Sequence, residues 1–157
     1  MSNVNNELKN TLIRLFENSI IEVISTVSGV SVFKVNCDSN INDNFAGILM
    51  FSGEINGIFM IKTDEQSLRA LTSNITGHDI SFVKENDMID CIGELANMIC
   101  GTVRAKAAVN GIRFKSSIPF SAKGVSGLEF SFKKNALTFT LHFSSGIARI
   151  SARVVLI

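Results

Sequence analysis

The spacing of apolar residues in two long segments constrains the fold more than any other feature. In residues 5–27 and again in residues 86–109, apolar side chains recur at steps of three and four. An α-helix makes one turn in about 3.6 residues, so this spacing collects them on one face. The sequence therefore predicts two long amphipathic helices. The first ends near Gly29, and the second ends at Asn110 and Gly111.

The other segments have features typical of β-strands, turns and one shorter helix. Thr63 or Asp64 is suited to cap a helix that runs to Ile75 and ends at Gly77. Residues 37–44, rich in Asp, Asn and Ser, are expected to form a loop. Glycine-bearing turns at residues 53–57 and 144–146 predict two hairpins. The predicted strands are residues 30–36, 45–52, 58–62, 112–118, 128–132, 136–143 and 147–156.

This order of elements indicates an α+β fold in which long helices pack on a largely antiparallel sheet. We expect residues 1–157 to form a single domain, because no composition shift or linker divides the chain. A long helix followed by strands occurs twice, which suggests a weak internal two-fold repeat, although the two halves share little residue identity. The phenylalanines expected in the core are Phe114, Phe120, Phe130, Phe132, Phe139 and Phe143.

The charge balance argues against nucleic-acid and membrane partners. Lys and Arg number 15 and Asp and Glu number 14, so the chain lacks the basic excess that attracts nucleic acid or anionic lipid. No apolar run approaches the ~20 residues that span a bilayer. The first ten residues are polar and do not resemble a secretory signal. These features predict a cytoplasmic protein.

The cysteines and histidines match no metal-binding or redox pattern. Cys37, Cys91 and Cys100 are an odd number at irregular spacing, and the last two lie too far apart in one helix to pair. His78 and His142 have no acidic or cysteine neighbour at ligand spacing. We therefore expect reduced thiols, structural or surface histidines, and no metal or cofactor belonging to this chain.

The second long helix carries a short polar stripe opposite its apolar face. At about 100° per residue, Asp90, Glu94, Asn97 and Gly101 fall together. A glycine inside a helix costs about 1 kcal/mol relative to alanine. Gly101 therefore indicates either close approach by a partner or neutral drift on a solvated face. The residues predicted to face the core are Ile92, Leu95, Ala96, Ile99, Val103 and Ala107.

A glutamate and an asparagine three residues apart on a helix lie about 5–6 Å from each other. The amide can orient a water molecule, and the carboxylate can accept a hydrogen bond or pair with a cation. Such a pair can direct water at a phosphoryl group when a partner supplies the metal and the charge stabilisation. The motif alone has low specificity, because Glu7 and Asn10 have the same spacing in the polar start of the first helix. We interpret that copy as solvated surface.

The second copy lies within a longer pattern that resembles the CheC/CheX/FliY phosphatase family. That pattern has a carboxylate or serine, three residues, Glu, two residues, Asn, and a proline about 22 positions later. Asp90, Glu94 and Asn97 have this spacing, and Pro119, the only proline in the chain, follows Asn97 by 22 positions. The resemblance covers roughly residues 45–130. One complete copy of the pattern resembles CheX more than most CheC proteins.

The resemblance implies a phosphatase that hydrolyses the aspartyl phosphate of a phosphorylated CheY-like receiver. By that resemblance Asn97 orients the attacking water and Glu94 pairs with a receiver lysine. Asp90 has at most a supporting role, and Pro119 shapes a strand end. The magnesium ion belongs to the receiver, and the protein is expected to form a homodimer through a sheet edge or a helix face.

Two other interpretations stay open at this stage. A non-catalytic dimeric adaptor would bind a receiver or another signalling protein without hydrolysis. An unrelated α+β domain could meet the spacing by chance, and burial of Glu94 and Asn97 would favour that interpretation over the other two. Two cysteines near the site and a valine at position 32, where a second motif would need proline, depart from the family pattern. Arg104 and Lys106 could help dock an acidic partner or simply end the helix in solvent.

Overall fold

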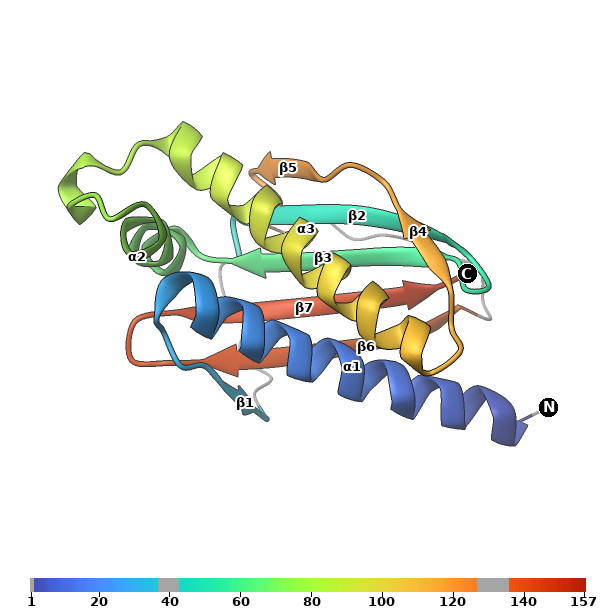
Figure 1. Ribbon diagram of the computed structural model, residues 1–157. Helices are drawn as coiled ribbons and strands as arrows, with labels where there is room; N and C mark the ends of the chain where they lie inside the picture. Colours follow the sequence, from blue (N-terminus) through green and yellow to red (C-terminus); the bar gives the residue numbers. More distant parts are fainter. Residues whose placement is uncertain (1, 37–42, 127–135) are drawn as a thin grey trace.

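One antiparallel sheet carries both long helices on the same face (Figure 1). The computed structural model describes residues 2–36, 43–126 and 136–157. Within these residues seven strands pair in the order β1-β6-β7-β3-β2-β4, and β5 also pairs with β2. The strands are β1 (Phe33–Val35), β2 (Phe45–Gly53), β3 (Gly57–Thr63), β4 (Phe114–Ser116), β5 (Phe120–Lys123), β6 (Leu137–Ser144) and β7 (Arg149–Leu156). The helices are α1 (Ser2–Ser28), α2 (Glu65–Thr76), η1 (Ile80–Phe82, one turn of 3-10 helix) and α3 (Glu85–Val109).

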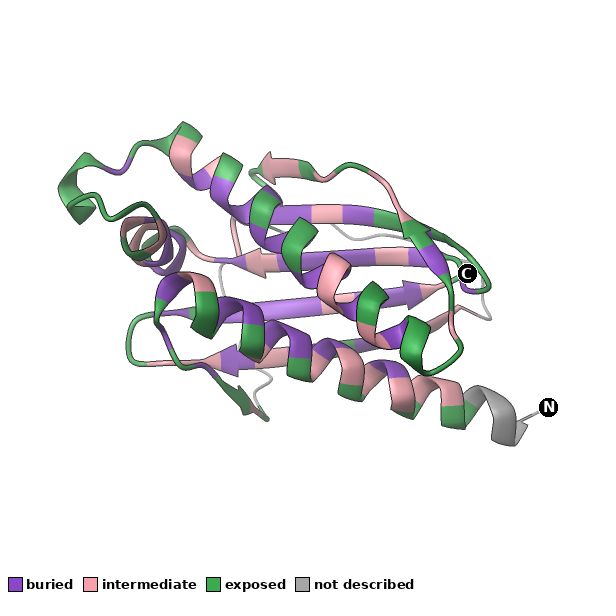
Figure 2. Cartoon of the chain, in the orientation of Figure 1, coloured by how far each residue is buried: buried purple, intermediate pink, exposed green. Residues whose placement is uncertain are grey.

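The core lies between the sheet and the inner faces of α1 and α3, which run side by side (Figures 1 and 2). Phe16 of α1 packs on Phe59 of β3 with ring centroids 5.0 Å apart. Because the helices bury one face and expose the other, each needs the amphipathic pattern found in its sequence. Every residue predicted to form the apolar face of the second long helix is buried: Ile92, Leu95, Ala96, Ile99, Val103 and Ala107.

Close contact at Gly47 sets the distance between α3 and the sheet. A Cβ atom at this glycine of β2 would lie 2.3 Å from the carbonyl oxygen of Ile92 and 2.9 Å from Cβ of Ala96. No larger residue fits without moving the helix backbone, so the glycine allows α3 to lie directly on β2.

Across the helix pair, Lys106 of α3 forms an ion pair with Glu22 of α1. Lys106 is therefore engaged within the molecule, while Arg104 is exposed.

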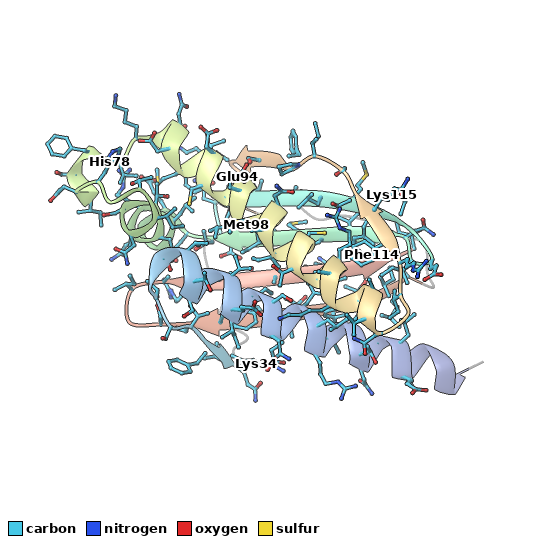
Figure 3. All side chains as sticks on the ribbon, in the orientation of Figure 1. Lys34, His78, Glu94, Met98, Phe114 and Lys115 are labelled. Carbon is cyan, nitrogen blue, oxygen red and sulfur yellow. The ribbon has the colours of Figure 1, made fainter. Side chains whose placement is uncertain are left out.

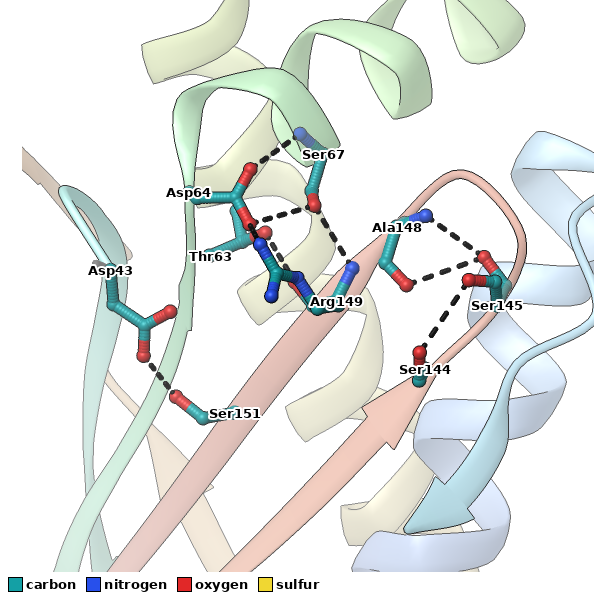
Figure 4. Close-up of polar contacts among 9 residues, drawn as sticks. All are labelled: Asp43, Thr63, Asp64, Ser67, Ser144, Ser145, Ala148, Arg149 and Ser151. Atoms are coloured by element: carbon teal, nitrogen blue, oxygen red, sulfur yellow. Dashed lines mark hydrogen bonds and ion pairs between the residues drawn. The ribbon is translucent and has the colours of Figure 1, made fainter. Parts of the chain in front are cut away.

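Asp64 begins α2 and also links this helix to the sheet. Its carboxylate accepts a hydrogen bond from the backbone N–H of Ser67 at 2.8 Å, as an N-cap does (Figure 4). The Ser67 hydroxyl accepts the backbone N–H of Arg149 at 2.9 Å, and the Thr63 hydroxyl donates to the carbonyl of Arg149 at 2.5 Å. α2 ends at Gly77 with φ 71°, a left-handed conformation that glycine favours.

The α+β class and the main elements are confirmed, and the errors fall in short strands. The expected strand at residues 30–36 shortens to β1, which pairs only with β6 among the described strands. The expected strand at residues 112–118 shortens to β4. Two elements were missed: β5 beyond the proline, and η1 between α2 and α3. The predicted strand at residues 128–132 lies outside the described residues, as do Phe130 and Phe132.

The core assignment of Phe120 is wrong. Its side chain is 65% exposed, whereas Phe114, Phe139 and Phe143 are buried as predicted. The physical reason is the alternation of side chains along β5. Ser121 points under α3, so the neighbouring Phe120, opposite Ile48 of β2, lies on the other side of the sheet.

Candidate active site on helix α3

The predicted polar stripe lies on the outward face of α3. Asp90, Glu94 and Asn97 are exposed, and Gly101 is partly exposed with no atom within 4 Å of the position that a Cβ would occupy. Figure 3 shows Glu94 and Met98 one turn apart on this helix, and Figure 2 shows exposed residues alternating with buried ones along α3. Because Glu94 and Asn97 are exposed, both the phosphatase and the adaptor interpretations stay open, whereas burial would have excluded them.

The polar side chains of the stripe have no partners within the described part of the chain. Asp90, Glu94 and Asn97 take part in no side-chain hydrogen bond, and the five ion pairs formed there involve other carboxylates. Asp90 and Glu94 are four residues apart, a spacing at which like charges repel and destabilise a helix. Two free carboxylates and a free amide are therefore available to a binding partner.

Pro119 and β5 border the stripe on one side. A Cβ atom at Gly93 would lie 2.4 Å from the Ser121 hydroxyl and 3.9 Å from Cβ of Pro119. The segment that joins β4 and β5 therefore runs close beside α3 near Gly93, the residue before Glu94. Pro119 separates these two strands, because a proline cannot donate to a strand ladder. The structure thus brings the predicted proline to the predicted helix, although the two are far apart in sequence.

A groove borders the stripe on its other side, between α3 and the carboxyl ends of α1 and α2. Its volume is about 350 Å³. The residues that line it are Val27, Ile75, Thr76, Asp87, Asp90, Cys91, Glu94, Leu95 and Met98. Glu94 therefore belongs both to the polar stripe and to the wall of the groove. The sequence did not indicate this groove, because three separate helices form it.

The two described cysteines are buried and poorly suited to thiolate chemistry. Burial raises the pKa of the Cys91 thiol, and it raises the pKa of Cys100 to about 11. Cys100 faces the interior, as expected, whereas Cys91 forms part of the groove floor. Both thiols are expected to stay protonated at neutral pH, so neither is a candidate nucleophile. Cys37 lies outside the described residues.

The chemistry of the stripe is limited to orienting and pairing. Among residues 2–36, 43–126 and 136–157, no three His, Cys, Asp or Glu side chains gather in a way that could hold a metal ion. No described helix is long and apolar enough to cross a membrane.

Comparison with known proteins gives the family. The family model described as chemotaxis phosphatase CheX matches residues 45–144 of the chain. The chain belongs to the CheX family. The match includes α3 with its polar stripe, the segment around Pro119 and most of the sheet. No curated protein matches the sequence at a significant level.

Solved CheX structures have the same fold. The CheX protein of Vibrio vulnificus superposes with a TM-score of 0.81 at 19% identity, covering 93% of this chain and 96% of that one. CheX of Desulfovibrio desulfuricans gives 0.79 at 20% identity, covering 94% and 99%. A complex of CheX with CheY, BeF3 and Mg²⁺ from Borrelia burgdorferi gives 0.73 at 14% identity, covering 92% and 96%. The resemblance to CheX predicted from the sequence is therefore confirmed.

Proposed function

We propose that this CheX-family protein hydrolyses the aspartyl phosphate of a CheY-like response regulator. The observation that carries the proposal is the exposed, unpartnered pair of Glu94 and Asn97 on α3 of a chain in a chemotaxis phosphatase family. A CheX protein of the same fold has been crystallised with CheY, BeF3 and Mg²⁺. That complex supports a receiver as the partner of this chain.

In the proposed reaction Asn97 orients the attacking water. Its amide oxygen accepts a hydrogen bond from the water, and its N–H group donates a hydrogen bond to an oxygen of the bound phosphoryl group. The water oxygen attacks phosphorus in line with the aspartyl oxygen. The phosphorus–oxygen bond to the aspartate breaks, and the aspartate leaves as a free carboxylate. Inorganic phosphate forms and carries both protons of the water, so the chain needs no nucleophile of its own.

Glu94 has the role of fixing the complex. Its free carboxylate lies one turn before Asn97 and is available to pair with a lysine beside the receiver's phosphorylation site. This pair would hold the amide of Asn97 over the phosphoryl group. Asp90 lies one turn further toward the start of α3 and adds negative charge to the same face. We assign it a supporting role.

Magnesium is proposed to come with the receiver. It would neutralise charge on the phosphoryl oxygens during attack. The described residues of this chain offer an amide and two carboxylates on the exposed face of α3, but no cluster that could hold the ion. The phosphatase would therefore complete a site whose metal already belongs to its partner.

The deciding experiment follows the decay of the phosphorylated CheY-type receiver from the same cell, with and without this protein. Wild type is expected to accelerate phosphate release, and Asn97→Ala is expected to lose the acceleration while keeping its thermal unfolding. The matched control is Asn10→Ala, which removes the exposed asparagine of the other Glu-x-x-Asn sequence. Equal activity of Asn97→Ala and wild type would overturn the assigned role.

The same experiment separates the phosphatase from a non-catalytic adaptor. An adaptor would bind the receiver without changing the lifetime of its phosphate.

We also propose that the protein is a homodimer, as its resemblance to CheX implies, through a sheet edge or a helix face. Light scattering coupled to size exclusion tests the dimer, and a molar mass near that of one chain would contradict it.

A further inference from the structure

The groove beside the polar stripe differs in character from the stripe itself. Its floor consists of apolar side chains and a protonated thiol: Val27, Ile75, Cys91, Leu95 and Met98. Its remaining lining residues are Thr76 and the three carboxylates Asp87, Asp90 and Glu94. Met98 is 41% exposed, so its side chain is accessible to a molecule that enters the groove. The groove therefore combines an apolar floor with a negatively charged rim.

The charge of this rim is not balanced within the described chain. No lysine, arginine or histidine lines the groove. Asp87 accepts a hydrogen bond from the backbone N–H of Lys84 at 2.9 Å, but Asp90 and Glu94 have no partner among the residues that the structure describes. A second hollow, near the start of α1, provides a contrast, because Glu7 and Glu17 share it with Arg14 and Lys34. Unbalanced carboxylates around an apolar floor fit a ligand that is apolar at one end and cationic at the other.

We propose that this groove binds a receiver segment in which an aliphatic side chain lies next to a lysine or arginine. The aliphatic group would enter between Val27, Ile75 and Met98, and the cation would pair with Asp90 at the rim. The inference rests on the proposed function, because the groove shares Glu94 with the catalytic face. It adds a second contact beside the phosphorylation site, one that selects the receiver without taking part in the chemistry.

The arrangement has a consequence for specificity. Glu94 and Asn97 are proposed to contact groups beside the phosphorylated aspartate. Many receivers would present similar groups there. The groove includes Glu94 of this pair, but it is formed by α1 and α2 as well as α3. Its shape therefore depends on residues outside the Glu-x-x-Asn motif. A receiver segment that fills it would distinguish one receiver from another by differential affinity.

The test measures affinity of the receiver, loaded with Mg²⁺ and beryllofluoride, for groove variants. Met98→Gln keeps the length of the side chain but makes the floor polar, and Thr76→Trp fills the groove from its exposed rim. We expect the dissociation constant to rise about tenfold for Thr76→Trp and several-fold for Met98→Gln. In turnover, both variants should raise KM for the phosphorylated receiver with little change in kcat.

The matched control is Met50→Gln. Met50 is 61% exposed on β2, outside the groove, so the same chemical change there should leave affinity unaltered. Asp90→Asn tests the rim, and it should weaken binding most at low salt, because the lost attraction is electrostatic. Thermal unfolding of each variant verifies that the fold is retained.

Two outcomes overturn the inference, and they are distinguishable. If wild type releases phosphate but the groove variants bind the receiver as well as Met50→Gln does, the groove is not a receiver site and the phosphatase proposal stands. If wild type neither binds the loaded receiver nor speeds phosphate release, the proposed function fails and the inference fails with it. If Met98→Gln and Thr76→Trp both bind the loaded receiver more weakly than wild type while Met50→Gln binds it equally well, the groove is supported as the second contact.

Discussion

At the scale of single residues, the Glu-x-x-Asn motif occurs twice in this chain, once as a candidate site and once as solvated surface. Glu7 and Asn10 repeat the spacing of Glu94 and Asn97, and all four side chains are exposed. The difference lies in what surrounds them. The hollow beside Glu7 contains cations that offset its charge, whereas Glu94 shares its surface with Asp90 and no cation. A short motif indicates a site only when its neighbours leave its groups free.

Gly101 gives a prediction at this scale. Apart from its chain neighbours and the backbone of α3 itself, no atom of the described residues lies within 4 Å of a Cβ placed there, so the fold does not require glycine. Gly101→Ala is expected to raise the free energy of unfolding by about 1 kcal/mol in urea titrations, because alanine is the better helix former. If the receiver approaches α3 closely at this point, the methyl group will also slow phosphate release. Unchanged release by the more stable variant would instead favour the drift interpretation.

Asp43 gives a prediction about pH. Its Oδ2 accepts the Ser151 hydroxyl at 2.6 Å, but Oδ1 is buried without a partner (Figure 4). Burial raises the pKa of this carboxyl above its usual 3.8, despite the opposing effects of the Ser151 hydrogen bond and of Lys62. The folded state therefore holds the Asp43 proton more tightly than the unfolded state does. The ionised carboxylate consequently costs stability at neutral pH.

Asp43→Asn should remove that cost. The variant is expected to be more stable than wild type at pH 7, and its advantage should shrink as the pH falls through the raised pKa of the folded state. Below 3.8 the advantage should disappear, because Asp43 is then protonated in both states of wild type. Denaturant titrations across this pH range test the prediction. A pH-independent difference would mean that Asp43 titrates normally.

At the scale of elements, the position of α3 depends on one glycine of β2. Gly47→Ala would place a methyl group 2.3 Å from the Ile92 carbonyl oxygen, a backbone atom that cannot rotate away. We expect a loss of about 1–3 kcal/mol in unfolding free energy, as for other overpacked cores. A displaced α3 should also lower phosphatase activity.

Gly93→Ala is the informative comparison for this prediction. Its new methyl group would meet the Ser121 hydroxyl at 2.4 Å, and a serine side chain can change rotamer. Its cost should therefore be smaller than that of Gly47→Ala. Equal stability losses would show that the carbonyl contact at Gly47 does not set the spacing between helix and sheet.

At the scale of the whole molecule, the active site is proposed to be complete only in the complex with the receiver. Chelating Mg²⁺ with EDTA is therefore expected to abolish the accelerated phosphate release, because the ion is proposed to come with the receiver. The unfolding temperature of this protein alone should not change on chelation. A lower unfolding temperature in EDTA would reveal a metal that stabilises this chain directly.

The sequence determined the parts of this protein that depend on local periodicity. Apolar residues at steps of three and four defined α1 and α3 and their buried faces, since a helix face is fixed by residue spacing alone. The same geometry placed Asp90, Glu94, Asn97 and Gly101 on one exposed stripe. The family resemblance followed from this local pattern together with Pro119, and the family match confirms it.

The tertiary structure decided what depends on contacts between distant segments. Phe120 was predicted to be buried, but the register of β5 on β2 places Ser121 under α3 and leaves Phe120 exposed. The groove could not be predicted, because Val27, Ile75 and Met98 come from three helices and meet only when these pack together. Spacing along the chain fixes which residues share a face. Only the packing of elements fixes what lies opposite that face.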